Sequence, residues 1–465
     1  MTTTHAMPRT RGPRLIGFLA TALVIVAASY ALSALRAPSP ATAPPAAAGL
    51  SGAAITPIGP PGETPIAGRG EAGHTTGSIE QIDHSIEAWA ENLAANPRDF
   101  ISATNLAMLF HGRGRLSSDL ADHERALDAA QTAIAIEPTH APARALEATV
   151  LFALHDFEAA FVAADTLVRE DPTQIGALAT RFDAELELGR IDEARADLQR
   201  LNEVGGPAVT IRAARLASAT GDAATALELA RQARSAADDV DSPELAFYAY
   251  AVGEYARLAG DAAVARSAFE HALALRPADP ASMTGLARID AFEGRMGAAI
   301  SWLRRATEIA PQPESLALLG DLLAGAGDPA GADAYATVRF IDQLGDVQAD
   351  AFDRALIRFE LDHGGATPAL LDESRASLAS RPDWTGHDTV AWALYRLGRY
   401  DEAAAEIAAA RALGADDARL RFHDGAINLA RGALADGNRL LQAALDLGPA
   451  LDPRERAEAE QLLRH

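Results

Sequence analysis

Histidine and acidic residues stand next to each other at three places in the C-terminal half of the chain, and these residue types can act as general acids and bases. The couples are Asp362 with His363, His387 with Asp388, and His423 with Asp424. Side chains of adjacent residues point in different directions from a helix, so the two members of a couple would not face one reacting group. We therefore expect structural or solvent-facing roles for these histidines.

Two residue types that carry much enzyme chemistry are missing from the chain. All 41 basic residues are arginines, and there is no cysteine. A phosphate-binding loop and a Schiff base need lysine, whereas a thiol nucleophile, a disulfide or a zinc knuckle needs cysteine. The HExxH and GxSxG motifs of zinc proteases and serine hydrolases are also missing. The sequence therefore predicts a protein that is not an enzyme and that binds no cofactor and no metal.

The chain is strongly acidic, since 64 Asp and Glu residues give it a formal net charge of −23. Such a surface repels the phosphates of nucleic acids and anionic lipid headgroups. We expect no nucleic-acid partner, and we interpret the acidity as a solvated face that keeps an alanine-rich protein soluble.

Aromatic and arginine side chains form groups that could bind another protein, because both kinds of residue are enriched in protein interfaces. The first group has the spacing of one helical face and consists of Phe247, Tyr250, Glu254 and Arg257. Arg288 follows Glu254 by 34 residues. The last group consists of Phe359, Trp392, Tyr395 and Arg396.

Each group also has a structural interpretation. Glu254 and Arg288 would form an ion pair between neighbouring helices, which stabilises a protein little when it is exposed to water. The aromatic rings would pack between helices instead of contacting a partner. Both interpretations stay open from the sequence.

The elements that carry these residues are helices. From residue 78 onward, apolar residues recur at helical spacing, Gly, Asp and Pro mark the turns between helices, and no strand-like alternation occurs. Turn residues recur at an interval of 34, from His155 to Gly189, from Gly260 to Gly294 and from Gly398 to Gly432. A fixed period of this size indicates structural repeats.

Two neighbouring copies show the repeat in most detail. One contains Gly253, Gly260, Ala265, Phe269, Ala272 and Pro277, and the next has Ala287, Gly294, Ala299, Leu303, Ala306 and Pro311 at +34. Small residues let helices approach closely, the second glycine closes a turn, and the proline ends a helix. This ladder of residues resembles the tetratricopeptide repeat family. The resemblance implies an all-α solenoid of helix-turn-helix units that binds proteins.

The resemblance covers residues 78–453 and implies about ten units. Their turns are expected near Gly114, His155, Gly189, Gly221, Gly260, Gly294, Gly327, Gly365, Gly398 and Gly432. The spacing is irregular around Gly114, Gly327 and Gly365. Residues 454–465 are expected to form a C-terminal helix that caps the stack, and the first helices of the units should line a concave groove for a protein or peptide partner.

The N-terminus predicts a membrane anchor. Arg9, Arg11 and Arg14 precede an uncharged, mostly apolar run at residues 15–35, which is long enough to cross a bilayer. The positive-inside rule places residues 1–14 in the cytoplasm and the repeat domain outside it. The alternative is a protein secreted after cleavage of a signal peptide. Residues 36–77 are rich in Pro, Ala and Gly and are expected to be a disordered linker.

These features favour a bacterial scaffold for protein–protein interactions that is anchored in the cell membrane, with its repeats periplasmic or extracellular. One alternative is a regulatory or substrate-presenting subunit of an envelope enzyme, secretion or biogenesis complex. Another is a hydrolase within the divergent residues 346–383. Some tetratricopeptide repeat proteins hold a partner's terminal carboxylate with lysines and asparagines, but this chain has no lysine for such a clamp.

The predicted orientation can be tested with single cysteines, because the chain has none of its own. In intact spheroplasts, an impermeant thiol reagent should label the Ser78→Cys variant and leave the Thr3→Cys variant unlabelled. The reverse pattern would contradict the orientation, and a mature N-terminus beyond residue 35 would establish cleavage.

Overall fold

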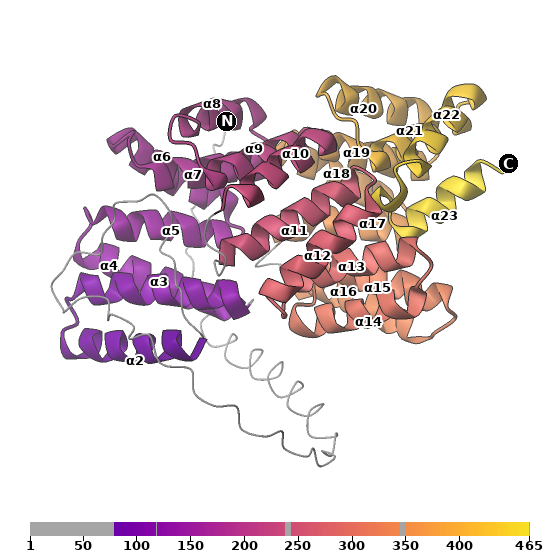
Figure 1. Cartoon of the computed structure of the whole chain (residues 1–465). Coiled ribbons are helices and arrows are strands. Elements are labelled where there is room, and N and C mark those ends of the chain that lie inside the picture. Colours follow the sequence, from indigo (N-terminus) through magenta and orange to yellow (C-terminus); the bar gives the residue numbers. More distant parts are fainter. Residues whose placement is uncertain (1–78, 118, 238–242, 345–348, 465) are drawn as a thin grey trace, which may run out of the picture. The chain divides into compact units, whose positions relative to one another are not determined.

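The computed structural model describes residues 79–117, 119–237, 243–344 and 349–464, and these residues form helices and no strand (Figure 1). The predicted cytoplasmic tail, transmembrane helix and linker, residues 1–77, lie outside the described residues. Within the described part of the chain, no helix combines the length and the apolar character needed to cross a membrane.

The described helices pair into ten successive hairpins, which we number repeats 1 to 10. The first helices of the repeats are α3 (Phe100–Ser117), α5 (Ala141–Ala153), α7 (Ile175–Glu187), α9 (Pro207–Ala219), α11 (Pro243–Leu258), α13 (Pro280–Phe292), α15 (Pro313–Gly325), α17 (Ala349–His363), α19 (Trp384–Arg396) and α21 (Ala418–Ala430). The second helices are α4 (Leu120–Ile136), α6 (Phe157–Glu170), α8 (Ile191–Leu201), α10 (Ala223–Ser235), α12 (Ala262–Leu275), α14 (Met296–Ile309), α16 (Ala330–Leu344), α18 (Pro368–Ser380), α20 (Tyr400–Ala412) and α22 (Leu434–Leu445). The expected all-α fold of about ten units is therefore confirmed for this part of the chain.

Further helices flank the repeats on both sides. Helix α2 (Ile79–Ala95) packs on α3. After repeat 10 come a short 3-10 turn, η1 (Gly448–Ala450), and helix α23 (Pro453–Leu462). Helix α23 contacts α21 and α22 at the end of the stack, and it also contacts α13 and α15.

A left-handed residue makes the turn inside most of the hairpins. At Gly260 φ is +87°, and the N–H of Asp261 donates to the Ala256 carbonyl at 2.8 Å, which closes the end of α11. Positive φ recurs at His155, Gly189, Gly221, Gly294, Gly327, Gly365, Gly398 and Gly432. The sequence predicted a turn at each of these positions, and the structure confirms them.

The turn predicted near Gly114 is wrong. Gly114 is buried inside α3, which continues to Ser117. A Cβ atom at Gly114 would lie 3.0 Å from the ring of His123 on α4. The glycine therefore serves close contact between the two helices of repeat 1 rather than a turn.

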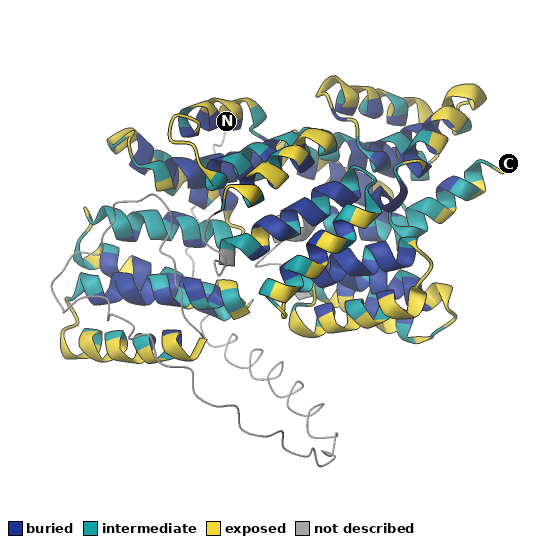
Figure 2. Ribbon diagram, in the orientation of Figure 1, coloured by how far each residue is buried: buried dark blue, intermediate teal, exposed yellow. Residues whose placement is uncertain are grey.

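The ring of Phe269 on α12 joins repeats 5 and 6. It is fully buried, and a Cβ atom at Gly253 of α11 would lie 2.6 Å from it. A Cβ atom at Gly285 of α13 would also overlap the ring. Six further ladder positions are at most 1% exposed, namely Ala265, Ala272, Ala287, Ala299, Leu303 and Ala306. Buried residues thus lie where helices face one another, as Figure 2 shows.

The first helices also contact each other from one repeat to the next. Such contacts join α3 to α5, α5 to α7, α11 to α13, α15 to α17, α17 to α19, and α19 to α21. These helices form the inner row expected of a solenoid. We call them the inner helices.

Repeats far apart in the chain touch as well. The turn at Gly189 in repeat 3 lies against Pro382, the turn at Gly221 in repeat 4 against Ala415, and the turn at Gly260 in repeat 5 against Leu447. These partners lie in the loops that follow repeats 8, 9 and 10. Each contact therefore joins a turn to the loop that follows the repeat five positions later.

The Gly285→Ala variant tests the packing around Phe269. Its methyl group has no room beside the buried ring, so the free energy of unfolding should fall by about 1–3 kcal/mol. The matched control is Gly297→Ala, because Gly297 lies in α14 with nothing within 4 Å of an added Cβ. The control should gain up to about 1 kcal/mol from helix propensity. Chemical denaturation followed by circular dichroism measures both, and equal effects would contradict the packing.

Candidate protein-binding groove

Arginines collect on the inner helices of repeats 5 to 10, although the chain as a whole is acidic. They are Arg257 on α11, Arg288 on α13, Arg358 on α17, Arg396 on α19 and Arg419 on α21. Arg257 is buried and the other four are half-buried. These side chains form the candidate groove.

The C-terminal end of the chain lies in this groove. We call residues 447–463, which contain η1 and α23, the tail segment. Arg257 donates hydrogen bonds to the carbonyls of Pro449 and Ala450, at 3.0 and 3.2 Å. The same guanidinium also holds Glu254, at 2.6 Å. An inner helix thus binds the backbone of η1 through hydrogen bonds.

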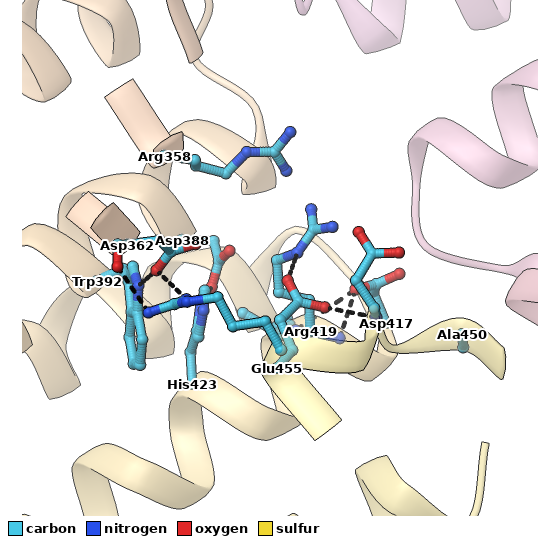
Figure 3. A network of polar contacts seen from close by, with 12 residues as sticks. Arg358, Asp362, Asp388, Trp392, Asp417, Arg419, His423, Ala450 and Glu455 are labelled. Atoms are coloured by element: carbon cyan, nitrogen blue, oxygen red, sulfur yellow. Dashed lines mark hydrogen bonds and ion pairs between the residues drawn. The ribbon is translucent and has the colours of Figure 1, made fainter. Parts of the chain in front are cut away.

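The tail segment also presents a row of acidic side chains to the groove. Arg288 donates to Asp452 at 2.8 Å. Arg419 donates to Glu455 at 2.6 Å, as Figure 3 shows, and Arg396 donates to Glu458 at 2.8 Å. Residues three apart share one face of a helix, so a single acidic stripe meets arginines from three inner helices.

One contact runs in the opposite direction, from the tail segment to an inner helix. Arg454 donates to the carbonyl of Asp362 on α17 at 2.8 Å, and it lies 3.0 Å from the carboxylate of the same residue. Burial alone would raise the pKa of Asp362, but the charge of Arg454 and the hydrogen bond from Trp392 outweigh it and lower this pKa. The carboxylate is therefore held in its ionised form.

Electrostatics keep the tail acid Asp452 ionised in the same way. Burial disfavours its charge, but Arg288, Arg257 and Arg419 together lower the pKa of Asp452 well below its usual range. Asp452 is also the N-cap of α23, in a capping box with Glu455. The two acids therefore start the helix and bind the groove at once.

Repeats 5 to 7 match a known family. The model of the tetratricopeptide repeat matches residues 256–322. This part of the chain consists of tetratricopeptide repeats.

Two solved structures are similar to parts of the chain. PilW, a widely conserved type IV pilus biogenesis factor, is 18% identical, with 42% of this chain and 90% of PilW covered and a TM-score of 0.36. MamA is 15% identical, with 35% of this chain and 93% of MamA covered and a TM-score of 0.28. Among curated protein sequences, none matches the chain. These similarities assign no partner to it.

Glu254 and Arg288 lie near enough for each charge to shift the pKa of the other residue, as expected of neighbours, but each has another residue as its direct partner. Glu254 pairs with Arg257 in its own helix, and Arg288 pairs with Asp452 of the tail segment. The tail segment supplies a carboxylate that the spacing of the repeats could not indicate. Three of the residues proposed from the sequence for partner binding, Arg257, Arg288 and Arg396, thus contact a peptide that belongs to the same chain.

For Trp392 the structure supports packing between helices, one of the two interpretations that the sequence left open. Its side chain is 1% exposed, and its ring stacks on His423 at 3.9 Å and on Tyr395 at 4.8 Å. Its indole N–H donates to Asp362 at 2.9 Å (Figure 3). The guanidinium of Arg396 lies 4.4 Å from its ring. Trp392 is buried because α17 and α21 cover α19 from both sides. It positions Asp362 and Arg396, which both contact the tail segment.

The remaining aromatic candidates differ in exposure. Phe359 is buried and stacks on His363 at 4.6 Å. Tyr250 is half-buried, 6.0 Å from the ring of Phe269. Phe247 is 42% exposed. A role of these residues in binding a partner stays a prediction.

The histidines of the three couples pair with acids elsewhere in the chain. His363 contacts Asp321, His387 contacts Glu406, and His423 contacts Asp388, each at 2.7 Å. Asp388 lies on the first helix of the preceding repeat, 35 residues before His423. The histidines therefore link helices, as their structural interpretation predicted.

The segment considered for a hydrolase contains the helix pair α17 and α18 of an ordinary repeat. A cavity of about 450 Å³ beside it is lined by charged residues, but their carboxylates are paired. The pairs are Glu187 with Arg215, Glu314 with Arg358, and Asp383 with Arg354, at 2.6–2.9 Å.

The residues of the tail segment were missed from the sequence, as were Asp362 and Arg419. Their contacts fall outside the period of 34, so no repeat pattern indicates them. The available signal is the three-residue spacing of Asp452, Glu455 and Glu458, which marks an acidic face on a short helix.

His363 should make stability depend on pH. Burial opposes its charge, but hydrogen bonds to Asp321 and to the Phe359 carbonyl outweigh burial and raise the pKa of His363 above its ordinary 6.5. Its contribution is therefore complete below that pH and is lost as the pH rises through the folded-state pKa. The His363→Gln variant should cost about 1.5–3 kcal/mol of unfolding free energy at low pH and less as the solution becomes alkaline.

Denaturation at a series of pH values measures this difference. In the Asp321→Asn background the cost of His363→Gln should no longer fall as the pH rises, because the carboxylate that favours the imidazolium is gone. A cost that grows with pH in the native background would contradict the assignment.

Proposed function

We propose that this tetratricopeptide repeat protein is a scaffold that binds a protein or peptide partner along the inner helices of repeats 5 to 10. The observation that carries the proposal is the pair of hydrogen bonds from Arg257 to the backbone carbonyls of Pro449 and Ala450. Backbone recognition of this kind suits a segment of another protein as well as the chain's own. No reaction is assigned to the protein.

The chemistry of the groove supports a protein ligand. Arginine presents a planar fork that binds carboxylates and carbonyls in defined directions, and it keeps its charge when it is buried. The groove combines such forks from several inner helices with aromatic rings behind them. Arginine and aromatic residues dominate the binding energy of many protein interfaces.

The proposed location follows from the sequence alone. Residues 15–35 would anchor the protein in the cell membrane, and residues 36–77 would hold the repeats away from the bilayer outside the cytoplasm. The net charge of −23 favours a protein partner over a nucleic acid.

Site-specific photo-crosslinking in cells tests the groove. A photoreactive residue at Phe247, on inner helix α11, should crosslink to the partner, whereas one at Met296, on the second helix α14, should not. The two positions are a matched pair, because both side chains are 42% exposed. Crosslinks from position 296 alone would contradict the proposed groove. Capture of one stoichiometric enzyme would favour the subunit of an envelope complex.

A further inference from the structure

Charge contributes much of the hold on α23, whereas η1 and Leu451 ahead of it in the tail segment are buried. Of the ten residues of α23, only Ala459 is buried, whereas α21 buries most of its length. The carboxylates that hold the tail segment keep some contact with water, since the side chains of Asp452, Glu455 and Glu458 are 25%, 13% and 23% exposed. Elements with few buried apolar contacts open at a lower cost than the body of a fold.

The tail segment also leaves one hydrogen-bond donor of the groove without an acceptor. In the described structure, the buried Nε of Arg396 has no hydrogen-bond acceptor, although its Nη2 binds Glu458. Arg358 lies near Arg419, and the charge of Arg419, together with burial, lowers the pKa of Arg358. The groove therefore has positive charge and a free donor that a better acidic ligand would use.

We propose that α23, with its N-cap Asp452, is an autoinhibitory occupant of the groove, and that the partner is a helical segment of another protein with acidic side chains at three-residue intervals. The partner would displace α23 and take over Arg288, Arg419 and Arg396. This inference rests on the proposed function, since it concerns the same groove.

The stripe of the tail segment defines the chemistry of the partner. Its helix starts with an acidic N-cap, carries Pro453 in the first turn and has its next acids at the third and sixth helical positions. An acidic first turn favours the helix, because it faces the positive end of the helix dipole. A partner helix with the same stripe would present the same carboxylates.

Competition with the tail segment would control access to the groove. Two residues separate α22 from η1, so the tail segment stays close to the groove even when it is released. A tethered ligand of this kind has an effective concentration in the millimolar range. An outside ligand binds only in proportion to the fraction of molecules whose groove is open.

A fluorescent peptide with the sequence of residues 446–465 serves as the probe, and its binding to the full chain is measured by anisotropy. The variant Asp452→Asn/Glu455→Gln/Glu458→Gln weakens the hold of the chain's own tail segment. It should bind the probe at least tenfold more tightly than the native chain does. A probe with the same three substitutions should bind this variant at least tenfold more weakly than the native probe.

The matched control is Glu460→Gln. Glu460 is an acid of the same helix, but it pairs with Arg456 within α23, at 3.2 Å. This variant should bind the probe as weakly as the native chain. Tight binding by the control, or no gain in the folded triple variant, would overturn the proposal.

Hydrogen exchange on the native chain provides a test that needs no variant. Amides of α23 should exchange at least tenfold faster than those of α21, because the tail segment opens without unfolding of the repeats. Equal exchange would make α23 an integral part of the fold and overturn the proposal. Native chains that exchange tail segments to form dimers would overturn it too, since the occupant would be a second copy.

Failure of the inference can be told apart from failure of the proposed function. Crosslinks from position 247 without any gain in probe binding would leave the groove as the binding surface and remove only the competition by the tail segment. If position 247 gives no crosslinks and the triple variant shows no gain in probe binding, the groove is not the binding surface.

Discussion

Close approach between helices is the constraint on which the rest of the structure depends. Alanine and glycine let two helices approach so closely that one larger side chain, such as Phe269 or Leu303, fills the space between them. A single hairpin built in this way cannot cover its own apolar face, and stacking of successive hairpins completes the core. The inner row, and with it the groove, exists because every repeat meets this constraint at the same positions.

Positive side chains gather on the inner helices of repeats 5 to 10, although the chain as a whole is negatively charged. The protein carries a net charge of −23, yet its inner helices present arginines to a common segment. Removing one member of a partly buried ion pair leaves an unpaired charge that costs free energy, so an acidic occupant stabilises such a groove. Arginine suits the task better than lysine, because one fork can hold two groups, as Arg257 holds both Glu254 and the backbone of the tail segment.

The sequence predicted the repeats well because their contacts recur at a fixed interval. The turns at Gly260 and Gly294 and the buried Phe269 all follow from that period. Gly114 was misread, since a glycine for close contact looks the same in a sequence as one for a turn. The burial of Trp392 and the partners of Arg288 depend on the neighbouring repeats and on the tail segment. Contacts with the tail segment have no period, so the sequence pattern could not indicate them.

The offset of five repeats between touching segments has a consequence for synthesis. A simple stack has only neighbour contacts, so it can grow and fray from either end. Here 192 residues separate Arg257 from its acceptor Pro449, and contacts across such distances slow folding. As the chain leaves the ribosome, repeats 3 to 5 have their turns at Gly189, Gly221 and Gly260 uncovered until the loops after repeats 8 to 10 arrive. A chain that stalls before its last repeats would keep an unfinished edge and would be a substrate for chaperones or proteases.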